Sequence, residues 1–244
     1  MLKEIYEQPK AIRETIGTRL NNSKVNFDEL GFTKDYLESI NKMYVIACGT
    51  AMHAGLVSKN LFEKLCKIPV EVDIASEFRY RDPLVDDKTL VIYISQSGET
   101  ADTIAALKLA KSKGAKTIAI SNVIGSSITR EADYSIYTHA GPEIAVASTK
   151  AYTSQVTMLT LIALYFAEIL GRTDTNKIDT IKEDLLKLPS KAEEVLKDTS
   201  KIQEVAKRIY KEKDMFFLGR GVDYAVSLEG SLKLKEISYI HSEG

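Results

Sequence analysis

One stretch of sequence decides the fold: Leu90-Val91-Ile92-Tyr93-Ile94-Ser95-Gln96-Ser97-Gly98-Glu99-Thr100. Its apolar first part, up to Ile94, is typical of a strand covered by helices on both faces of a parallel sheet. The small and polar residues that follow lead into a helical pattern, which runs to about Lys111. The stretch therefore predicts a strand, a turn and a helix, which together form the repeating unit of an α/β fold.

Similar apolar runs recur on both sides of this stretch and alternate with helical segments. They cover residues 43–47, 70–74, 117–120 and 134–137. Together with residues 90–94 they predict a three-layer α/β sandwich with a parallel sheet of about five strands. Right-handed crossovers then bring every strand-to-helix turn to one edge of the sheet, where open α/β sheets bind their ligands.

The predicted sheet domain occupies residues 42–171, and the segments around it differ in pattern. Residues 1–41 are mostly polar, with a helical spacing interrupted by Pro9, and predict a helical arm. Residues 172–213 are charged and amphipathic, and predict two connecting helices with a break at Pro189. Residues 214–244 open with the same strand-then-glycine pattern as residues 42–49, which predicts a second copy of the domain. One strand and one helix cannot bury a core, so we expect this second copy to be incomplete.

Composition and charge narrow the class of protein. The 244 residues are 44% hydrophobic, which fits a globular domain. The formal net charge is -1, so the chain has no excess of positive charge that would attract nucleic acid. The most apolar run, residues 156–167, is shorter than the roughly 20 residues that a bilayer requires. No leader pattern begins at Met1, so we expect neither a membrane partner nor export. Two cysteines are too few for a disulfide framework and favour the cytoplasm.

Three predicted turns bring hydroxyl groups to the expected ligand edge. They are Cys48-Gly49-Thr50, residues 95–100, and Ala147-Ser148-Thr149 at the start of a long apolar helix. Unpaired backbone N–H groups at helix starts bind anions, and the hydroxyls of Ser95, Ser97 and Thr100 add neutral donors. Helix capping explains each turn taken singly, whereas three of them at one edge predict a polar pocket for a sugar phosphate. The glycine motifs that bind ATP or NAD are absent, and no cofactor is expected.

Charged residues gather on the predicted helix near the end of the sequence: Glu229, Lys233, Lys235 and Glu236. Spacings of three and four residues usually indicate a solvated charged face. A carboxylate beside a cation also suits the proton shuttle of an aldose–ketose isomerisation. Spacing alone leaves both interpretations open. The histidines share no metal-ligand spacing, and no metal site is expected.

With these residues assigned, the chain resembles the isomerase half of the glutamine:fructose-6-phosphate amidotransferase family. The similarity rests on residues 48–50, 75–81, 95–103, 146–151 and 232–241, which occur in the family's order. The segment Lys3-Glu4-Ile5-Tyr6-Glu7-Gln8-Pro9 is similar to the family's connector between its glutaminase and first sugar isomerase (SIS) domain. The resemblance implies a SIS domain of the flavodoxin or Rossmann type, followed by the start of a second one.

The resemblance also implies roles for individual residues. The phosphate is expected at Ser95, Gln96, Ser97 and Thr100. The sugar is expected at Cys48, Gly49, Thr50, Ala51, Val146, Ala147 and Ser148. Glu236 is implied as the isomerisation base and Lys233 as its helper. The family usually has a serine where this chain has Ala51, so one hydroxyl contact is missing while the backbone amide remains.

That family makes glucosamine 6-phosphate and glutamate from fructose 6-phosphate and glutamine. The resemblance therefore implies an isomerase region that binds fructose 6-phosphate, glucosamine 6-phosphate or glucose 6-phosphate and forms a homodimer. The family's glutaminase domain and ring-opening histidine have no counterpart in residues 1–244, so we expect sugar-phosphate binding with little or no synthase activity. Two alternatives remain open. One is a sugar-phosphate-sensing SIS module, which needs no base, and the other is a stand-alone aldose–ketose isomerase with a single SIS domain.

Overall fold

The computed structural model describes residues 1–17, 19–21 and 24–244. Its centre is a five-stranded sheet in the order β4-β3-β5-β6-β7, and every pairing within it is parallel. The strands are Lys42–Ala47 (β3), Val70–Ile74 (β4), Thr89–Ser95 (β5), Lys116–Ser121 (β6) and Tyr134–Tyr137 (β7). Each lies within about one residue of its predicted bounds. The predicted α/β class and parallel sheet are confirmed.

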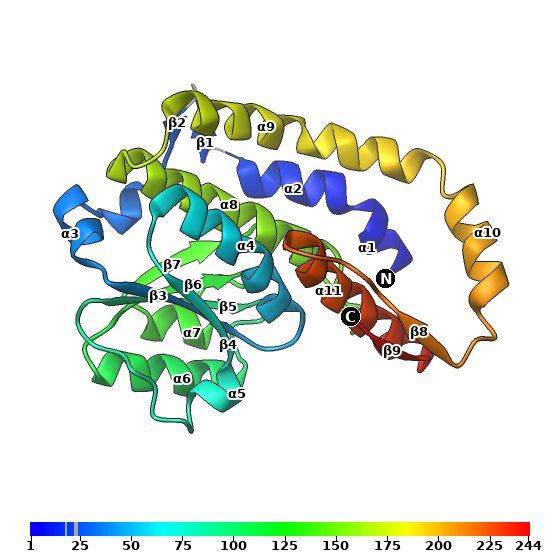
Figure 1. The fold of residues 1–244 in the computed structure, drawn as a ribbon, viewed down its shortest axis with the longest axis horizontal. Coiled ribbons are helices and arrows are strands. Elements are labelled where there is room, and N and C mark those ends of the chain that lie inside the picture. Colours follow the sequence, from blue (N-terminus) through cyan, green and yellow to red (C-terminus); the bar gives the residue numbers. More distant parts are fainter. Residues whose placement is uncertain (18, 22–23) are drawn as a thin grey trace.

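Successive residues of β3 point into two different cores. Met43, Val45 and Ala47 pack in the core shared with α4 (Thr50–Cys66) and α8 (Lys150–Leu170). Tyr44 and Ile46 pack in the core on the opposite face, with α5 (Ala75–Phe78), α6 (Ala101–Ser112) and α7 (Ser127–Glu131). Figure 1 shows the resulting three layers, with α4 and α8 on one side of the sheet and α6 and α7 on the other.

Helix α8 is the central helix of its layer. By length and composition alone it could cross a membrane, because it has 21 residues and a mean hydropathy of 1.4 over its most apolar window. In the fold, however, 67% of that window is buried. It packs against α4, α2 (Gln8–Ile16) and the sheet, so its apolar surface is explained by core packing.

The N-terminal arm consists of two helices, followed by a segment of short strands and short helices. Helices α1 (Leu2–Tyr6) and α2 meet at Glu7, and Pro9 lies in the first turn of α2, where a missing N–H costs little. Beyond α2 come the short strands β1 (Leu20–Asn21) and β2 (Lys24–Val25), the 3₁₀ helix η1 (Asp28–Leu30) and α3 (Lys34–Ser39). Phe27, Leu30 and Leu37 of this polar-looking segment are fully buried in the α8 core. Of the predicted arm, Thr18, Asn22 and Ser23 lie outside the described residues.

The connecting segment forms α9 (Thr175–Lys197) and α10 (Ser200–Ile209), so two helices are present as predicted. The predicted break at Pro189 is wrong, because Pro189 lies inside α9 and the helix ends eight residues later, at Lys197. Pro189 is buried together with Ile178 and Leu185 on the face that packs on α2 and α8. Burial of this face offsets the one backbone hydrogen bond that proline cannot make.

The last segment repeats the start of the sheet domain in detail. It consists of β8 (Asp214–Phe216), α11 (Val222–Ser238) and β9 (His241–Glu243), with β8 parallel to β9 as β3 is to β4. Gly49 caps α4 with φ 55° and ψ -132°, and Gly221 caps α11 with φ 62° and ψ -127°. Both helices have 17 residues and end at a left-handed residue. The geometry therefore supports a duplicated strand–helix–strand unit, and α11 packs on α4.

Removing a buried side chain of the arm tests whether residues 25–40 belong to the core. We expect Leu37→Ala to lower the free energy of unfolding by about 2–5 kcal/mol, because Leu37 is 0% exposed. Leu84→Ala is the matched control, since Leu84 is 86% exposed and such a site should change stability by less than about 0.5 kcal/mol. Urea unfolding followed by circular dichroism measures both. Equal stability of the two variants would show that the arm is not part of the core.

Candidate functional site

A polar cavity of about 280 Å³ lies at the carboxyl ends of the central strands. We call it the edge cavity, and its lining residues are Cys48, Thr50, Ala51, Ile94, Ser95, Gln96, Ser97, Thr100, Thr103, Glu143, Ala145, Val146, Ser148 and Gln155. All of the predicted binding residues line it except Gly49 and Ala147. Gly49 is the residue that caps α4, and Ala147 is buried next to the cavity wall. The three predicted turns therefore meet at one edge of the sheet.

The turn between β5 and α6 leaves hydrogen-bond donors free to contact a ligand in the cavity. The Gly98 N–H donates to Ser95 Oγ (3.1 Å), and the Glu99 N–H donates to Ser97 Oγ (3.2 Å). Since the Ser97 oxygen accepts from the backbone, its own O–H is left to donate to a ligand. Thr100, the residue before α6, makes no side-chain capping bond, so the first N–H groups of α6 are available to an anion.

The carboxylate of this turn is held away from the cavity. Glu99 accepts hydrogen bonds from Ser127 Oγ (2.6 Å) and the Ser127 N–H (2.7 Å) at the start of α7. These two bonds lower the pKa of the Glu99 carboxyl, so it is ionised at neutral pH. Its charge therefore stabilises the start of α7 and does not line the cavity.

The loop before α8 has the opposite hydrogen-bonding character. The Glu143 carboxylate accepts from Ser148 Oγ (2.8 Å) and from the Thr149 N–H (2.8 Å). Because the Ser148 proton is directed to Glu143, Ser148 Oγ can only accept a hydrogen bond from a ligand. Glu143 also lines the cavity, and no Lys or Arg does so among the described lining residues. This side of the cavity therefore favours a ligand that carries hydroxyl donors.

Helix α11 brings charged side chains to the cavity wall. Lys233 Nζ donates to Thr50 Oγ1 (2.8 Å) and forms a very short ion pair with Glu236. Thr50 Oγ1 in turn donates to Glu229 Oε1 (3.0 Å), and His53 Nδ1 of α4 lies 2.7 Å from Glu229 Oε2. Neither Lys233 nor Glu236 lines the edge cavity itself. Lys233 lies directly behind Thr50, and Glu236 lies behind Lys233.

Three features of this site were missed from the sequence. Glu229 is only 5% exposed, so the helix face interpreted as a solvated stripe is partly an interhelical contact. Glu143 organises the third turn, and Gln155 of α8 adds a buried amide to the cavity wall. The spacing of Glu229 and Lys233, four residues apart on one predicted helix, was the available signal. Nothing in the local pattern identifies Glu143.

Gly98 tests the close packing of the first turn. An added methyl group would lie 2.0 Å from Ser126 Oγ and 2.4 Å from Ser126 Cβ. We therefore expect Gly98→Ala to displace the turn and weaken binding of inorganic phosphate by about tenfold or more. Isothermal calorimetry measures the affinity.

Gly125→Ala is the matched control, because Gly125 has the same φ of 69° but no heavy atom of the described chain within 4 Å of the added carbon. Both variants carry the backbone strain of about 1–2 kcal/mol, and only Gly98→Ala adds the clash. Equal phosphate affinity of the two variants would contradict the proposed close packing.

Comparisons with known proteins agree with this arrangement. The sequence profile of the SIS domain matches residues 36–165 and 208–244. Over all 244 residues the chain is 58% identical to glutamine–fructose-6-phosphate aminotransferase (isomerizing) of Clostridium tetani, and equally to that of Caldanaerobacter subterraneus. The chain spans 40% of the length of these curated relatives.

A solved structure matches as well. It is the C-terminal domain of glucosamine-fructose-6-phosphate aminotransferase from Francisella tularensis, with a TM-score of 0.94 and 41% sequence identity. The match covers 100% of this chain and 68% of that one. The β8–α11–β9 segment lies within both the structural match and the profile match.

Proposed function

The chain belongs to the SIS domain family, and on that premise we propose that it is the sugar-phosphate-binding isomerase region of an enzyme that makes glucosamine 6-phosphate and glutamate from fructose 6-phosphate and glutamine. The resemblance found in the sequence is confirmed, as is the SIS fold. Support for the proposed activity comes from relatives named for it that match the chain from end to end.

The observation that carries the proposal is the division of the edge cavity into a donor end and an acceptor end. The donor end combines the Ser97 hydroxyl with the uncapped start of α6. A phosphate group carries only acceptors when fully ionised, so it fits there. The acceptor end combines Glu143 with Ser148 Oγ, which suits the hydroxyl groups of a sugar. One hexose phosphate satisfies both ends.

The proposed chemistry uses α11 at the side of the cavity. In the conversion of ketose to aldose, a base removes a proton from C1 of fructose 6-phosphate and returns it to C2. We assign this base to Glu236 and the stabilisation of the intermediate's negative charge to Lys233. Lys233 contacts both Glu236 and Thr50 Oγ1, so it bridges the carboxylate and the cavity wall.

Assembly and location are part of the proposal. The resemblance supports a homodimer, and the two free thiols, Cys48 and Cys66, support a reducing compartment such as the cytoplasm. The ligands proposed are fructose 6-phosphate, glucosamine 6-phosphate and glucose 6-phosphate. A sensing module and a stand-alone isomerase remain the competing functions. The sensor differs in needing no base at Glu236.

Ser97→Ala tests the phosphate end. Loss of one hydrogen bond to a charged group is worth about 1.5–3 kcal/mol, so we expect the Kd for fructose 6-phosphate to rise by about 10- to 100-fold. Ser112→Ala is the control, because Ser112 is exposed at the far end of α6, the helix that follows the Ser97 turn, and donates to the Leu109 carbonyl. Calorimetry with fructose 6-phosphate measures both variants. Identical affinities for the wild type and Ser97→Ala would refute the assignment.

Glu236→Gln tests the base. We expect this variant to slow the exchange of the C1 proton of fructose 6-phosphate with solvent deuterium by at least about 100-fold, because general bases contribute this much or more. Binding should stay unchanged, and NMR follows the exchange. Glu204→Gln removes a charge from α10, away from the cavity, and should exchange like the wild type. Equal exchange rates in Glu236→Gln and the wild type would contradict the assignment of the base and favour the sensing module.

A further inference from the structure

The loop between β7 and α8, residues 138–149, forms one wall of the edge cavity without regular secondary structure. It contributes Glu143, Ala145, Val146 and Ser148 to the lining. Asn122 holds the start of the loop, donating to the Gly141 carbonyl (2.8 Å) and accepting from the Ala140 N–H (2.8 Å). Glu143 closes the end of the loop on α8. Neither contact reaches its middle, at Ile144 and Ala145.

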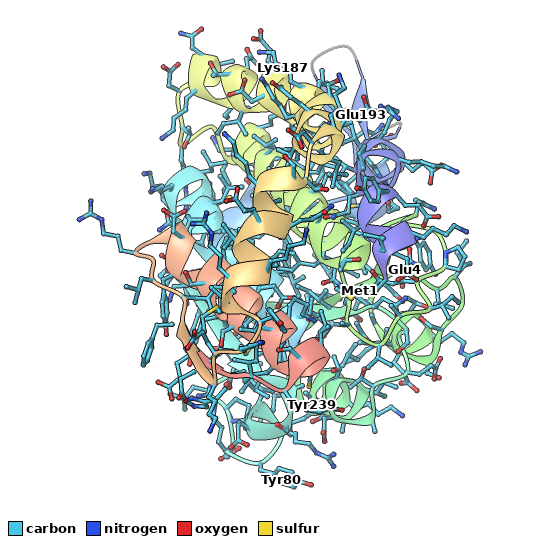
Figure 2. The ribbon with its side chains drawn as sticks, turned by 90° about the vertical axis from the view of Figure 1, so that its right-hand side faces the viewer. Met1, Glu4, Tyr80, Lys187, Glu193 and Tyr239 are labelled. Atoms are coloured by element: carbon cyan, nitrogen blue, oxygen red, sulfur yellow. The ribbon has the colours of Figure 1, made fainter. Side chains whose placement is uncertain are left out.

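Glu4 of α1 supplies the contact to the middle of the loop. Its Oε1 accepts from the Ile144 N–H (2.6 Å) and from the Ala145 N–H (3.2 Å). The side chain is nearly buried, at 6% exposure of the residue. Hydrogen bonding from the Ile144 N–H lowers the pKa of the Glu4 carboxyl, so the group is ionised at neutral pH. Figure 2 labels Glu4 and Met1 on the N-terminal helical segment.

Two further contacts tie the same N-terminal segment to the two ends of the loop. Glu7 Oε2 pairs with Lys150 Nζ at 2.7 Å, and Lys150, the first residue of α8, is 3% exposed. The Thr15 hydroxyl donates to the Thr138 carbonyl at 2.6 Å. Burying Lys150 without a partner would be costly, so Glu7 fixes the position of α1 against α8. Helix α1 is thereby held where Glu4 can reach Ile144.

We propose that α1 is a clamp that sets the shape of the β7–α8 loop, and that Glu4 and Glu7 are positioning residues for the sugar end of the edge cavity. This inference rests on the proposed function, because it assigns the loop to the sugar. Through Ala145 and Val146, a change at Glu4 alters the part of the cavity wall that the β7–α8 loop forms. A change that moves the N-terminal segment therefore alters the affinity for the sugar and leaves the affinity for phosphate unchanged.

The experiment compares four forms of the chain: wild type, Glu4→Ala, Glu4→Gln and Glu14→Gln. Glu14 is the matched control, since it lies on the neighbouring helix α2, pairs only weakly with Lys10 at 3.7 Å and loses the same charge. Hydrogen–deuterium exchange is measured over residues 140–150, with the melting temperature as a check on folding. Calorimetry gives the Kd for fructose 6-phosphate and, separately, for inorganic phosphate.

We expect Glu4→Ala to speed amide exchange at Ile144 and Ala145 about tenfold and to weaken fructose 6-phosphate binding about fivefold or more. Inorganic phosphate should bind within about twofold of wild type, because its site is the β5–α6 turn. Glu4→Gln keeps one acceptor oxygen and should lie between wild type and Glu4→Ala, while Glu14→Gln should match wild type.

Unchanged exchange at Ile144 and Ala145 in Glu4→Ala would overturn the clamp. An equal loss of affinity for fructose 6-phosphate and phosphate would also overturn it, since that pattern reports a general loss of structure. If the wild type binds no fructose 6-phosphate, the proposed function fails instead, and the exchange measurement still decides whether Glu4 holds the loop.

Discussion

The register of the parallel sheet is the constraint on which the site depends. Ala47 pairs with Ile94 and Ser95 pairs with Ser121, so the strands end at one level and the turns after them emerge side by side. A slip of one residue would turn the side chains of β3 from one core into the other. The two cores differ, because one takes the fully buried ring of Tyr93 and the other takes Ile92 and Ile94. Core packing therefore fixes the position of the turns.

Helices α8 and α6 both begin at this edge, and the N–H groups of their first turns differ in their hydrogen-bond acceptors. The start of α8 is satisfied within the protein, because the Glu143 carboxylate accepts from the Thr149 N–H and, at 3.3 Å, from the Ala151 N–H. The start of α6 has no such internal acceptor among its described capping contacts. An internal anion and an external one can therefore occupy neighbouring helix ends, each offset by its own helix dipole. This arrangement explains how a cavity lined by a carboxylate remains suited to a dianion.

The elements that depend on local pattern could be predicted from the sequence. Apolar runs predicted the five strands, and the serine-rich turn together with the family resemblance predicted most of the residues that line the cavity. Contacts between distant elements could not be predicted. Glu229 meets His53 across 176 positions of the chain, and helical spacing does not distinguish such a contact from a solvated face. The predicted helix break at Pro189 was wrong for the same reason. Burial of Pro189 against other elements outweighed the local tendency of proline to break a helix.

The repeated strand–helix–strand unit has a consequence for how this protein can change. Helices α4 and α11 are equivalent in their caps and length, yet α4 contributes Thr50 to the wall of the edge cavity, whereas α11 places Lys233 against Thr50 and Glu236 against Lys233. Under the proposed function, the two copies of the unit therefore supply different groups, a hydroxyl of the cavity wall from α4 and the proposed base with its cation from α11. Mutations in one copy can change the cavity wall while the other copy keeps its charged pair, so the two sets of groups can diverge separately.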